Sequence, residues 1–392
     1  MTQHYKYLIL GGGVASYDAI KGIREMDPGG TLGLISKEAF PPYHRPYLSK
    51  KLWKGAPFES VWLNLEGLNV ELYLNRAATT LDPHNKTVLD DHDDEYSYDK
   101  LLIATGGTPR RLPFGGDRIL YFRDMADYHT LRSQIGQSKH FGVIGGGFIG
   151  SELAAALAMN GEKVTMIFPE EGIGSRIFPQ SLALYLNDFY RSKGVEVLAG
   201  QNIVNLEEGG DTVELVTDQG KKIPAQTVIA GIGILPNLGL PKAAGLQVDR
   251  GLSVDERLRT SDPDIYAAGD ITEFYQPLLA HKLRVEHEDN AQNMGRQAGR
   301  NMAGMGESYE HLSYFYSDMF ELGYEAVGEL DPSQEIFIDW QEPFKKGVIY
   351  YLSEARVRGV LAWNVWDTTG PARQLLNLPG PFYPENLKGR LG

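Results

Sequence analysis

The chain has 392 residues, with 51 acidic and 38 basic side chains, a formal net charge of −13 and no cysteine. The lack of cysteine excludes disulfides, cysteine-ligated zinc, cysteine-ligated iron–sulfur clusters and a thiol nucleophile. The acidic balance argues against non-specific binding to nucleic acid or an anionic membrane, because such binding needs lysine and arginine to neutralise phosphates.

The length predicts two or three domains, at roughly 100–200 residues per domain. The N-terminal sequence passes from Lys6 directly into a short apolar run and glycines, without the longer apolar region of a signal peptide. The longest uncharged run lies between Lys222 and Lys242 and contains three prolines and three glycines, which is not typical of a spanning helix. We therefore expect a soluble, cytoplasmic protein.

The first motif is a strand–turn–helix–strand unit close to the N-terminus. Residues 7–10 (YLIL) predict a strand, residues 11–16 (GGGVAS) a tight turn, and the apolar periodicity that follows a helix to about Met26, before a second strand over 31–36. In such a unit a GxGxxG turn is typical of dinucleotide binding, because its glycines permit the bend, the approach of the pyrophosphate and close packing of helix on strand. Gly11 and Gly13 fill the first two positions, and the small residue Ser16 stands in the third.

The segment 76–110 predicts strands joined by an acidic turn and then a buried strand, LLIATG. Its cluster of five ionisable residues has two interpretations, a metal site or a solvated hairpin turn, and a run of like charges favours the turn. The cluster consists of Asp90, Asp91, His92, Asp93 and Asp94.

A second copy of the motif begins 134 residues after the first. Residues 141–144 (FGVI) predict a strand, 145–150 (GGGFIG) a turn with all three glycines, 151–160 a helix and 163–168 (KVTMIF) another strand. A lone GxGxxG is weak evidence, and two glycine-rich turns in an unrelated α/β protein are the alternative. Two complete βαβ frames favour two nucleotide-binding units.

The remaining segments complete the predicted architecture. Residues 223–237 repeat the strand-then-glycine pattern of LLIATGG, and residues 264–274 form a strand that ends at Gly269 and Asp270. From about Ser313, apolar and polar residues alternate before a helix-like PARQLLN, which indicates a separate antiparallel sheet. The predicted fold is α/β, with two Rossmann-like dinucleotide-binding domains and a C-terminal α+β domain.

These motifs together resemble the FAD-dependent pyridine-nucleotide oxidoreductases with a glutathione-reductase-like fold, in the ferredoxin/rubredoxin reductase and apoptosis-inducing-factor branch. The resemblance covers nearly the whole chain and is carried by PPYHRPYLSKKLW (41–53), LLIATGGTPR, the RVExxxNA segment that starts at 284, YFYSD (314–318) and WNVW. FPEEGIGSRIFP (168–179) is most similar to apoptosis-inducing factor. The resemblance implies a discontinuous FAD-binding domain (1–113 and 245–312), an NADH-binding domain (114–244) and a C-terminal domain (313–392).

The resemblance also implies roles in FAD binding. Arg45 would add a cation near the phosphates, and Asp270 would accept hydrogen bonds from the ribityl chain. Lys50 would approach the flavin N5 edge and pair with Glu152, linking two domains beneath the hydride path, with an ordinary surface ion pair as the alternative. The residues implied for FAD are Gly11, Gly13, Ser16, Glu38, Arg45, Lys50, Ala104, Thr105, Gly106, Asp270, Glu286, His287 and Tyr316.

The second unit would bind the nicotinamide nucleotide. A carboxylate at the end of its second strand, Glu170, can accept both ribose hydroxyls and repels a 2′-phosphate, so we predict a preference for NADH over NADPH. Arg176 is the residue that opposes this prediction, because it could tolerate a phosphate. The residues implied for NADH are Gly145, Gly147, Phe148, Ile149, Gly150, Glu152, Glu170, Arg176 and Gly233.

Three positions depart from the reductase pattern. Lys37 occupies the place of the acid that holds the FAD ribose, and Glu38 follows it as a substitute. Glu288 and Tyr316 each stand where reductases carry tryptophan. His287 resembles the apoptosis-inducing-factor version of its segment, and two roles stay open for it: a contact with the isoalloxazine or a structural hydrogen bond.

The function implied is hydride transfer from NADH to flavin N5, followed by single-electron transfer to an iron–sulfur protein of the ferredoxin or rubredoxin type. Lys50, Glu152 and His287 would form the catalytic site, without a metal. The alternative is a redox-switched NADH-binding flavoprotein similar to apoptosis-inducing factor, with slow oxidase activity and NADH-linked homodimerisation. An NADH oxidase or quinone reductase is a third possibility.

The predicted electron acceptor needs a basic docking surface. Ferredoxins are usually acidic, so the net charge of −13 opposes their encounter with this chain. Two runs of lysines are candidates for a local basic patch, although solvated surface is the default interpretation of both. They are Lys50, Lys51 and Lys54, and Lys345 and Lys346.

Overall fold

The computed structural model describes residues 2–210 and 212–392. The chain forms two compact units: unit 1 contains Met1–Arg45, Glu59–Thr108 and Leu235–Ser313, and unit 2 contains Pro46–Phe58, Pro109–Ile234 and Tyr314–Gly392. Residues 46–58 thus group with the segments predicted to bind NADH. The division into three domains with assigned cofactors stays a prediction. None of the described helices is long and apolar enough to cross a membrane.

Unit 1 is built on a sheet with the strand order β3-β2-β1-β6-β5-β4, and β18 also pairs with β6. The strands β3, β2, β1, β6 and β18 run parallel, whereas β4, β5 and β6 pair antiparallel. The strand order reverses beside β1, which places the carboxyl ends of β1, β2, β6 and β18 around one crevice position. The strands are β1 (Gln3–Leu10), β2 (Leu32–Ser36), β3 (Glu71–Leu74), β4 (Ala78–Asp82), β5 (Thr87–Asp90), β6 (Glu95–Ile103) and β18 (Ile265–Ala267).

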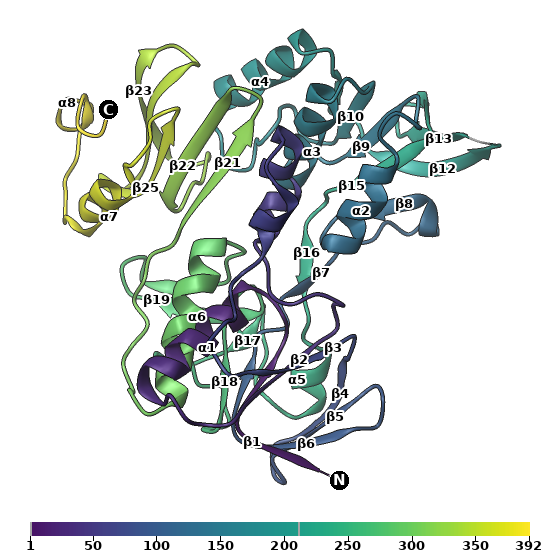
Figure 1. Ribbon diagram of the computed structural model, residues 1–392. Coiled ribbons are helices and arrows are strands. Elements are labelled where there is room, and N and C mark those ends of the chain that lie inside the picture. Colours follow the sequence, from purple (N-terminus) through teal and green to yellow (C-terminus); the bar gives the residue numbers. More distant parts are fainter. Residues whose placement is uncertain (1, 211) are drawn as a thin grey trace. The chain divides into compact units, whose positions relative to one another are not determined.

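Helices α1 (Val14–Met26) and α6 (Glu288–Met302) lie side by side in unit 1 (Figure 1). They approach through small residues: a Cβ atom on Gly295 or Gly299 would lie 2.1 Å from the carbonyl oxygen of Ala15 or Ala19. The predicted strand–turn–helix–strand unit at the N-terminus is confirmed. The remaining elements of unit 1 are β7 (Gly107–Pro109, which ends one residue beyond it), β16 (Ile234–Pro236, which begins one residue before it), α5 (Gly239–Ala243), β17 (Leu252–Ser253), β19 (Thr272–Gln276) and β20 (His281–Leu283), with short 3₁₀ turns at Arg45–Leu48 and Phe58–Val61 on its boundary with unit 2.

Unit 2 repeats the parallel arrangement, with the strand order β11-β10-β9-β15-β8. The strand order reverses beside β9, so the predicted second βαβ motif is also confirmed. The elements are η2 (Lys51–Lys54), η4 (Gly116–Arg118), β8 (Ile119–Tyr121), α2 (Met125–Ser133), β9 (Phe141–Ile144), α3 (Phe148–Met159), β10 (Val164–Phe168), α4 (Gln180–Ser192), β11 (Glu196–Ala199), β15 (Thr227–Ala230) and the antiparallel strands β12 (Ile203–Gly209), β13 (Thr212–Thr217) and β14 (Lys222–Ala225).

The C-terminal part of unit 2 is an antiparallel sheet with the order β21-β22-β25-β24-β23, and α7 packs on β22 and β25 (Figure 1). The predicted antiparallel sheet is confirmed, but its central strands β24 and β25 are buried along most of their length rather than at alternate residues. The elements are β21 (Tyr314–Met319), β22 (Leu322–Gly328), β23 (Glu335–Glu342), β24 (Lys346–Ser353), β25 (Arg356–Trp363), α7 (Thr369–Asn377) and α8 (Pro384–Leu387).

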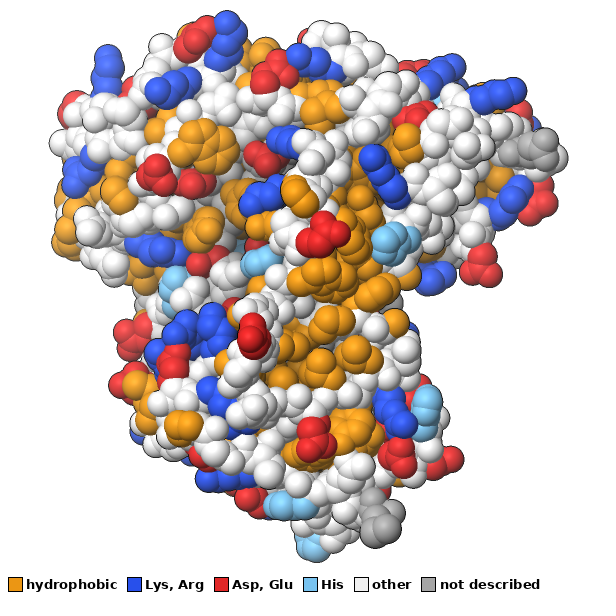
Figure 2. Space-filling view, viewed as in Figure 1, with side chains coloured by type: hydrophobic (Ala, Val, Ile, Leu, Met, Phe, Trp, Pro, Cys, Tyr) orange, Lys and Arg blue, Asp and Glu red, His pale blue; other side chains and the backbone are white. Residues whose placement is uncertain are grey.

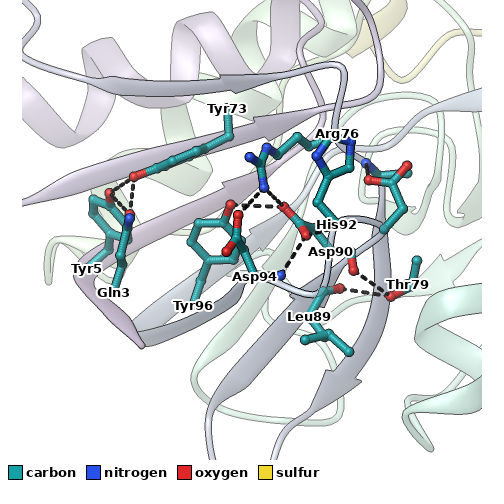
Figure 3. A network of polar contacts seen from close by, with 12 residues as sticks. Gln3, Tyr5, Tyr73, Arg76, Thr79, Leu89, Asp90, His92, Asp94 and Tyr96 are labelled. Carbon is teal, nitrogen blue, oxygen red and sulfur yellow. Dashed lines mark hydrogen bonds and ion pairs between the residues drawn. The ribbon is translucent and has the colours of Figure 1, made fainter. Parts of the chain in front are cut away.

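The acidic cluster at 90–94 forms the turn between β5 and β6 (Figure 3). The buried Asp90 carboxylate accepts hydrogen bonds from Arg76 at 2.8 Å, from Tyr96 at 2.9 Å and from the backbone N–H groups of His92 and Asp94. The predicted hairpin turn is therefore confirmed. Within residues 2–210 and 212–392 no group of three metal-ligating side chains comes together.

Candidate functional site

The first glycine-rich turn joins β1 to α1 in unit 1. Gly11 has a φ of +114°, and a Cβ atom there would lie 2.2 Å from the carbonyl oxygen of Ala104, at the end of β6. Only glycine therefore fits this position, because both the backbone conformation and the neighbouring strand exclude a side chain. The turn brings the predicted residues at 11–16 and 104–106 together.

Polar groups at the start of α1 lack partners within the described chain. Gly13 caps the helix without a side-chain hydrogen bond, and a Cβ atom there would meet nothing within 4 Å. The hydroxyls of Ser16 and Thr105 are buried, and neither forms a hydrogen bond with another described residue. A helix N-terminus with open N–H groups and nearby hydroxyls matches the requirements of a phosphate group.

Asn237 fixes the turn that carries Thr105. Its side-chain amide donates to the Thr105 carbonyl at 2.8 Å, and its backbone N–H donates to the Gly106 carbonyl at 3.0 Å. Asn237 ends the segment 223–237, whose pattern predicted a strand and a glycine turn but no role for this residue.

Glu38 and Arg45, two predicted FAD residues, contact each other at the end of β2. Arg45 donates to Glu38 at 2.6 Å and lies over the Tyr43 ring at 5.1 Å, while the Tyr43 hydroxyl donates to Glu38 at 2.6 Å. The Lys37 side chain is exposed. Tyr43 and Arg45 thus hold the Glu38 carboxylate in place after β2, and its role as a substitute for the missing acid stays a prediction.

The predicted residues around the start of α6 fall into separate contacts. His287 caps α6 and contacts the Ser313 hydroxyl through Nδ1 at 3.1 Å, and burial lowers the pKa of His287 to about 4. Glu288 contacts His44 at 3.0 Å, which gives this departure from the reductase pattern a partner. We infer that His287 is neutral at pH 7.

Asp270 and Glu286 share a neighbour. Arg284 donates to the Asp270 carbonyl at 3.0 Å and pairs with Glu286 at 2.8 Å. Asp270 follows Gly269, which has a φ of +79°, and lies three residues after the end of β18. It therefore stands at the carboxyl end of the sheet of unit 1, where ligands of such sheets bind.

The second glycine-rich turn repeats the geometry of the first inside unit 2. Gly145 has a φ of +119°, and a Cβ atom there would lie 2.4 Å from the Gly231 carbonyl at the end of β15. A Cβ atom on Gly150 would lie 2.0 Å from the Gly145 carbonyl. Gly147 caps α3 without a side-chain hydrogen bond, and the space at its Cβ position is open.

Phe148 and Ile149 follow this turn. Phe148 is 43% exposed and packs edge-on against Phe315 at 5.5 Å, and Ile149 is half-buried. Gly233 has a φ of +92°, and its carbonyl accepts a hydrogen bond from the Arg110 backbone at 2.9 Å.

Glu170 follows β10 and forms an ion pair with Arg176 at 2.9 Å. The Arg176 side chain is 83% exposed, whereas that of Glu170 is 26% exposed. Arg176, the residue that opposes the NADH prediction, is thus ion-paired with Glu170, the carboxylate that favours it.

Lys50 and Glu152 form a buried ion pair at 2.8 Å within unit 2, with side chains only 9% and 2% exposed. This burial corrects the alternative interpretation of a surface ion pair. The Glu152 carboxylate also accepts hydrogen bonds from the Ser49 and Ser317 hydroxyls, each at 2.6 Å. The Lys50 ammonium lies 5.2 Å from the centre of the Tyr316 ring. Ser49 and Ser317 were not singled out from the sequence, although both lie inside the segments PYLSK and YFYSD that carry the resemblance.

Comparisons with known proteins match nearly the whole chain. The family described as "Pyridine nucleotide-disulphide oxidoreductase" matches residues 5–295, and "Apoptosis-inducing factor, mitochondrion-associated, C-term" matches residues 337–378. The chain belongs to the pyridine nucleotide-disulphide oxidoreductase family.

Two relatives within the family show the breadth of the match. The chain is 35% identical over 422 residues to apoptosis-inducing factor 1 of Dictyostelium discoideum, covering 95% of this chain and 78% of that protein. It is 30% identical over 396 residues to the ferredoxin–NAD(+) reductase component of the anthranilate 1,2-dioxygenase system of Burkholderia cepacia, covering 97% and 96%. The solved covalent complex of putidaredoxin reductase with putidaredoxin aligns with a TM-score of 0.91 and 29% identity, covering 97% of this chain and 95% of that one.

Membership of the family implies FAD and a pyridine nucleotide as cofactors. The structure supplies two positions that fit a dinucleotide, because both glycine-rich turns end in a helix start without a side-chain cap. Since this member of the family has no cysteine, it has no disulfide of its own to reduce.

Proposed function

We propose that the chain is an NADH-dependent FAD flavoprotein reductase that passes electrons singly to an iron–sulfur protein. The observation that carries this proposal is the pair of glycine-rich turns that each lead into a helix without a side-chain cap, in a chain without cysteine. Because no thiol relay exists, electrons must leave directly from the flavin. When bound, FAD accepts a hydride and releases its electrons one at a time.

In this proposal each unit has its own task. The turn of unit 1 binds FAD through the N–H groups of α1 and the hydroxyls of Ser16 and Thr105. The turn of unit 2 binds the dinucleotide through the N–H groups of α3. Lys50 places a positive charge beside the hydride path, and Glu152 holds that charge in position.

We also propose that NADH is preferred over NADPH. The support is the position of Glu170 two residues after the end of β10, where a carboxylate accepts ribose hydroxyls and repels a 2′-phosphate. Arg176 forms an ion pair with Glu170, so a 2′-phosphate that approached Arg176 would also meet the Glu170 carboxylate.

The proposed partner is a small acidic iron–sulfur protein. A relative named as a ferredoxin–NAD(+) reductase component and the solved complex of putidaredoxin reductase with putidaredoxin support a protein partner of this kind. Of the two lysine runs, Lys51 and Lys54 closely follow the buried Lys50 in the sequence. Lys54 lies 3.6 Å from Asp318, whereas Lys345 forms a shorter ion pair with Glu342 at 2.6 Å. We therefore propose the surface around Lys51 and Lys54 as the docking surface.

A second candidate function is a redox-switched protein similar to apoptosis-inducing factor. The match of residues 337–378 to the C-terminal region of that family and the 35% identity to the Dictyostelium protein favour it. In this function slow reduction by NADH changes the oligomeric state instead of feeding an acceptor.

One experiment separates the two functions. The FAD-loaded protein is reduced by NADH in a stopped-flow instrument and then mixed with a ferredoxin, a quinone or air. Fast reoxidation by ferredoxin supports the reductase. A persistent long-wavelength absorbance band, slow reoxidation by all three acceptors and an NADH-dependent change in mass would replace it with the second function.

A further inference from the structure

The Glu152 carboxylate is held by donors from two further segments of unit 2. Glu152 lies on α3, Ser49 directly precedes Lys50 before η2, and Ser317 lies on β21. Ser317 and Lys50 share the oxygen Oε1, at 2.6 and 2.8 Å, while Ser49 donates to Oε2 at 2.6 Å. Both oxygens therefore have a neutral donor, and one has the ammonium as well.

The surroundings of this carboxylate offer no other cation among the described contacts. Tyr190 and Tyr324 are buried close by, and burial together with the charge of Glu152 raises the pKa of both phenols. Tyr190 donates instead to the Ser151 carbonyl at 3.0 Å. The two phenols stay neutral, so the serine hydroxyls and Lys50 carry the stabilisation of the buried charge.

A buried carboxylate with an incomplete set of donors either reorients or binds a proton, because desolvation penalises its charged form. If Glu152 reorients, the Lys50 ammonium loses its fixed place beside the Tyr316 ring. The Ser49 hydroxyl also lies 3.4 Å from the Pro46 carbonyl, and the Ser317 hydroxyl also contacts the Tyr324 phenol. Among the described contacts, Glu152 is the charged group to which both hydroxyls donate.

We propose that Ser49 and Ser317 are positioning residues of the hydride-transfer site, which clamp Glu152 in the orientation that fixes the Lys50 ammonium. This inference rests on the proposed reductase function and adds two residues to its site. The strand β21 thereby connects the C-terminal sheet to the ion pair.

The test uses the FAD-loaded full chain with Ser317→Ala, Ser49→Ala and the double variant. We expect each single variant to slow the limiting rate of flavin reduction by NADH about three- to tenfold, and the double variant more. Loss of a hydrogen bond to a charged group predicts an upward shift of about one pH unit in the acid limb of that rate. NADH affinity and FAD content stay within about twofold of the wild type, because neither hydroxyl lies on a glycine-rich turn.

Two further variants make the test specific. Ser317→Thr keeps a hydroxyl and is expected to retain the wild-type rate and pH profile. Ser151→Ala removes a buried hydroxyl from the same helix that donates to the Gly147 and Phe148 carbonyls rather than to Glu152, and it is expected to leave the pH profile unchanged.

The results test the positioning role of Ser49 and Ser317 separately from the proposed reductase function. If the wild type is reduced by NADH and the alanine variants keep its rate and pH profile, or if Ser151→Ala shows the same shift, the clamp is wrong. If Ser317→Ala does not fold, Ser49→Ala and Ser317→Thr decide by the same criteria. A wild type that NADH and NADPH both fail to reduce contradicts the reductase proposal itself.

Discussion

Lys50 and Glu152 are both buried, and burial decides what each substitution does. Replacing Lys50 with Met leaves the carboxylate uncompensated, which is expected to lower the free energy of unfolding by about 3 kcal/mol. It also removes the positive charge that we propose lies beside the hydride path, so flavin reduction by NADH is expected to slow at least about tenfold. The paired variant Lys50→Met/Glu152→Gln is expected to recover stability but not rate.

Urea denaturation and stopped-flow reduction measure the two effects separately. FAD binding is expected to persist, because the glycine-rich turn of unit 1 is intact. Unchanged reduction kinetics in Lys50→Met would remove Lys50 from the catalytic site.

Cofactor choice also belongs to single residues. Glu170→Ser removes the carboxylate that we propose repels a 2′-phosphate, and it frees Arg176, so the ratio of kcat/KM for NADH over NADPH is expected to fall about tenfold or more. Glu171→Gln is the control. The Glu171 carboxylate accepts a hydrogen bond from the Gln180 side chain at 2.9 Å, and the ratio is expected to stay unchanged in this variant. A wild-type kcat/KM for NADPH equal to that for NADH would contradict the preference.

At the level of elements, the contact between α1 and α6 depends on small residues spaced four apart. Gly299→Ala would place Cβ 2.1 Å from the Ala19 carbonyl oxygen, so the helices must separate. We expect a loss of about 2 kcal/mol in the free energy of unfolding and weaker FAD retention. Gly29→Ala is the matched control in the same unit, because a Cβ atom there meets nothing within 4 Å. Equal denaturation midpoints for the two variants would show that the close approach is not required.

The hairpin of β5 and β6 predicts a dependence of stability on pH. Burial raises the pKa of Asp90, but hydrogen bonds from Arg76, from two backbone N–H groups and from Tyr96 outweigh it and lower the pKa to about 2. Because an unfolded aspartate titrates near about 3.9, this stabilisation is complete above about pH 4 and is lost as the pH falls towards 2.

Asp90→Asn is expected to cost about 2 kcal/mol at pH 7 and to flatten the fall in stability between about pH 4 and 2. Asp94→Asn provides the control, since its side chain is 59% exposed and its pair with Arg76 is a surface one. Denaturant midpoints measured across this pH range check both variants. A wild-type slope that persists in Asp90→Asn would assign the pH dependence to other carboxylates.

Element prediction succeeded where the signal was local. Both glycine-rich turns could be predicted from the sequence, because glycine lacks a Cβ atom and so tolerates the positive φ seen at Gly11 and Gly145. Ser49 and Ser317 stood in recognised segments, yet their role depends on a carboxylate more than 100 positions away in the sequence, at separations of 103 and 165 residues. A single sequence carries no signal for such a contact.

For the molecule as a whole, charge sets the conditions for meeting an acidic partner. On the face drawn in Figure 2, acidic and basic side chains of the described residues are interspersed rather than gathered by sign. With a net charge of −13, a local basic surface must therefore overcome general repulsion.

We expect Lys51→Glu/Lys54→Glu to raise the KM for an acidic ferredoxin at least about fivefold at low ionic strength, while the reduction of flavin by NADH stays unchanged. Lys345→Glu/Lys346→Glu changes the net charge equally and is the control. A similar rise in KM for both double variants would attribute the effect to net charge and contradict the docking surface. Steady-state reduction of ferredoxin at several salt concentrations provides the measurement.

The sequence by itself determined the two βαβ motifs, the absence of a thiol relay and the family, because these depend on residue type and short spacing. Only the tertiary structure decided that the Lys50–Glu152 pair is buried, that two serines complete it and that Arg176 is paired with Glu170. Burial and long-range pairing arise when distant segments pack together and exclude water, and a local sequence pattern does not predict them. The zero-cysteine count and the charge of −13 thus limit the chemistry, and the packing around Glu152 determines where we expect it to occur.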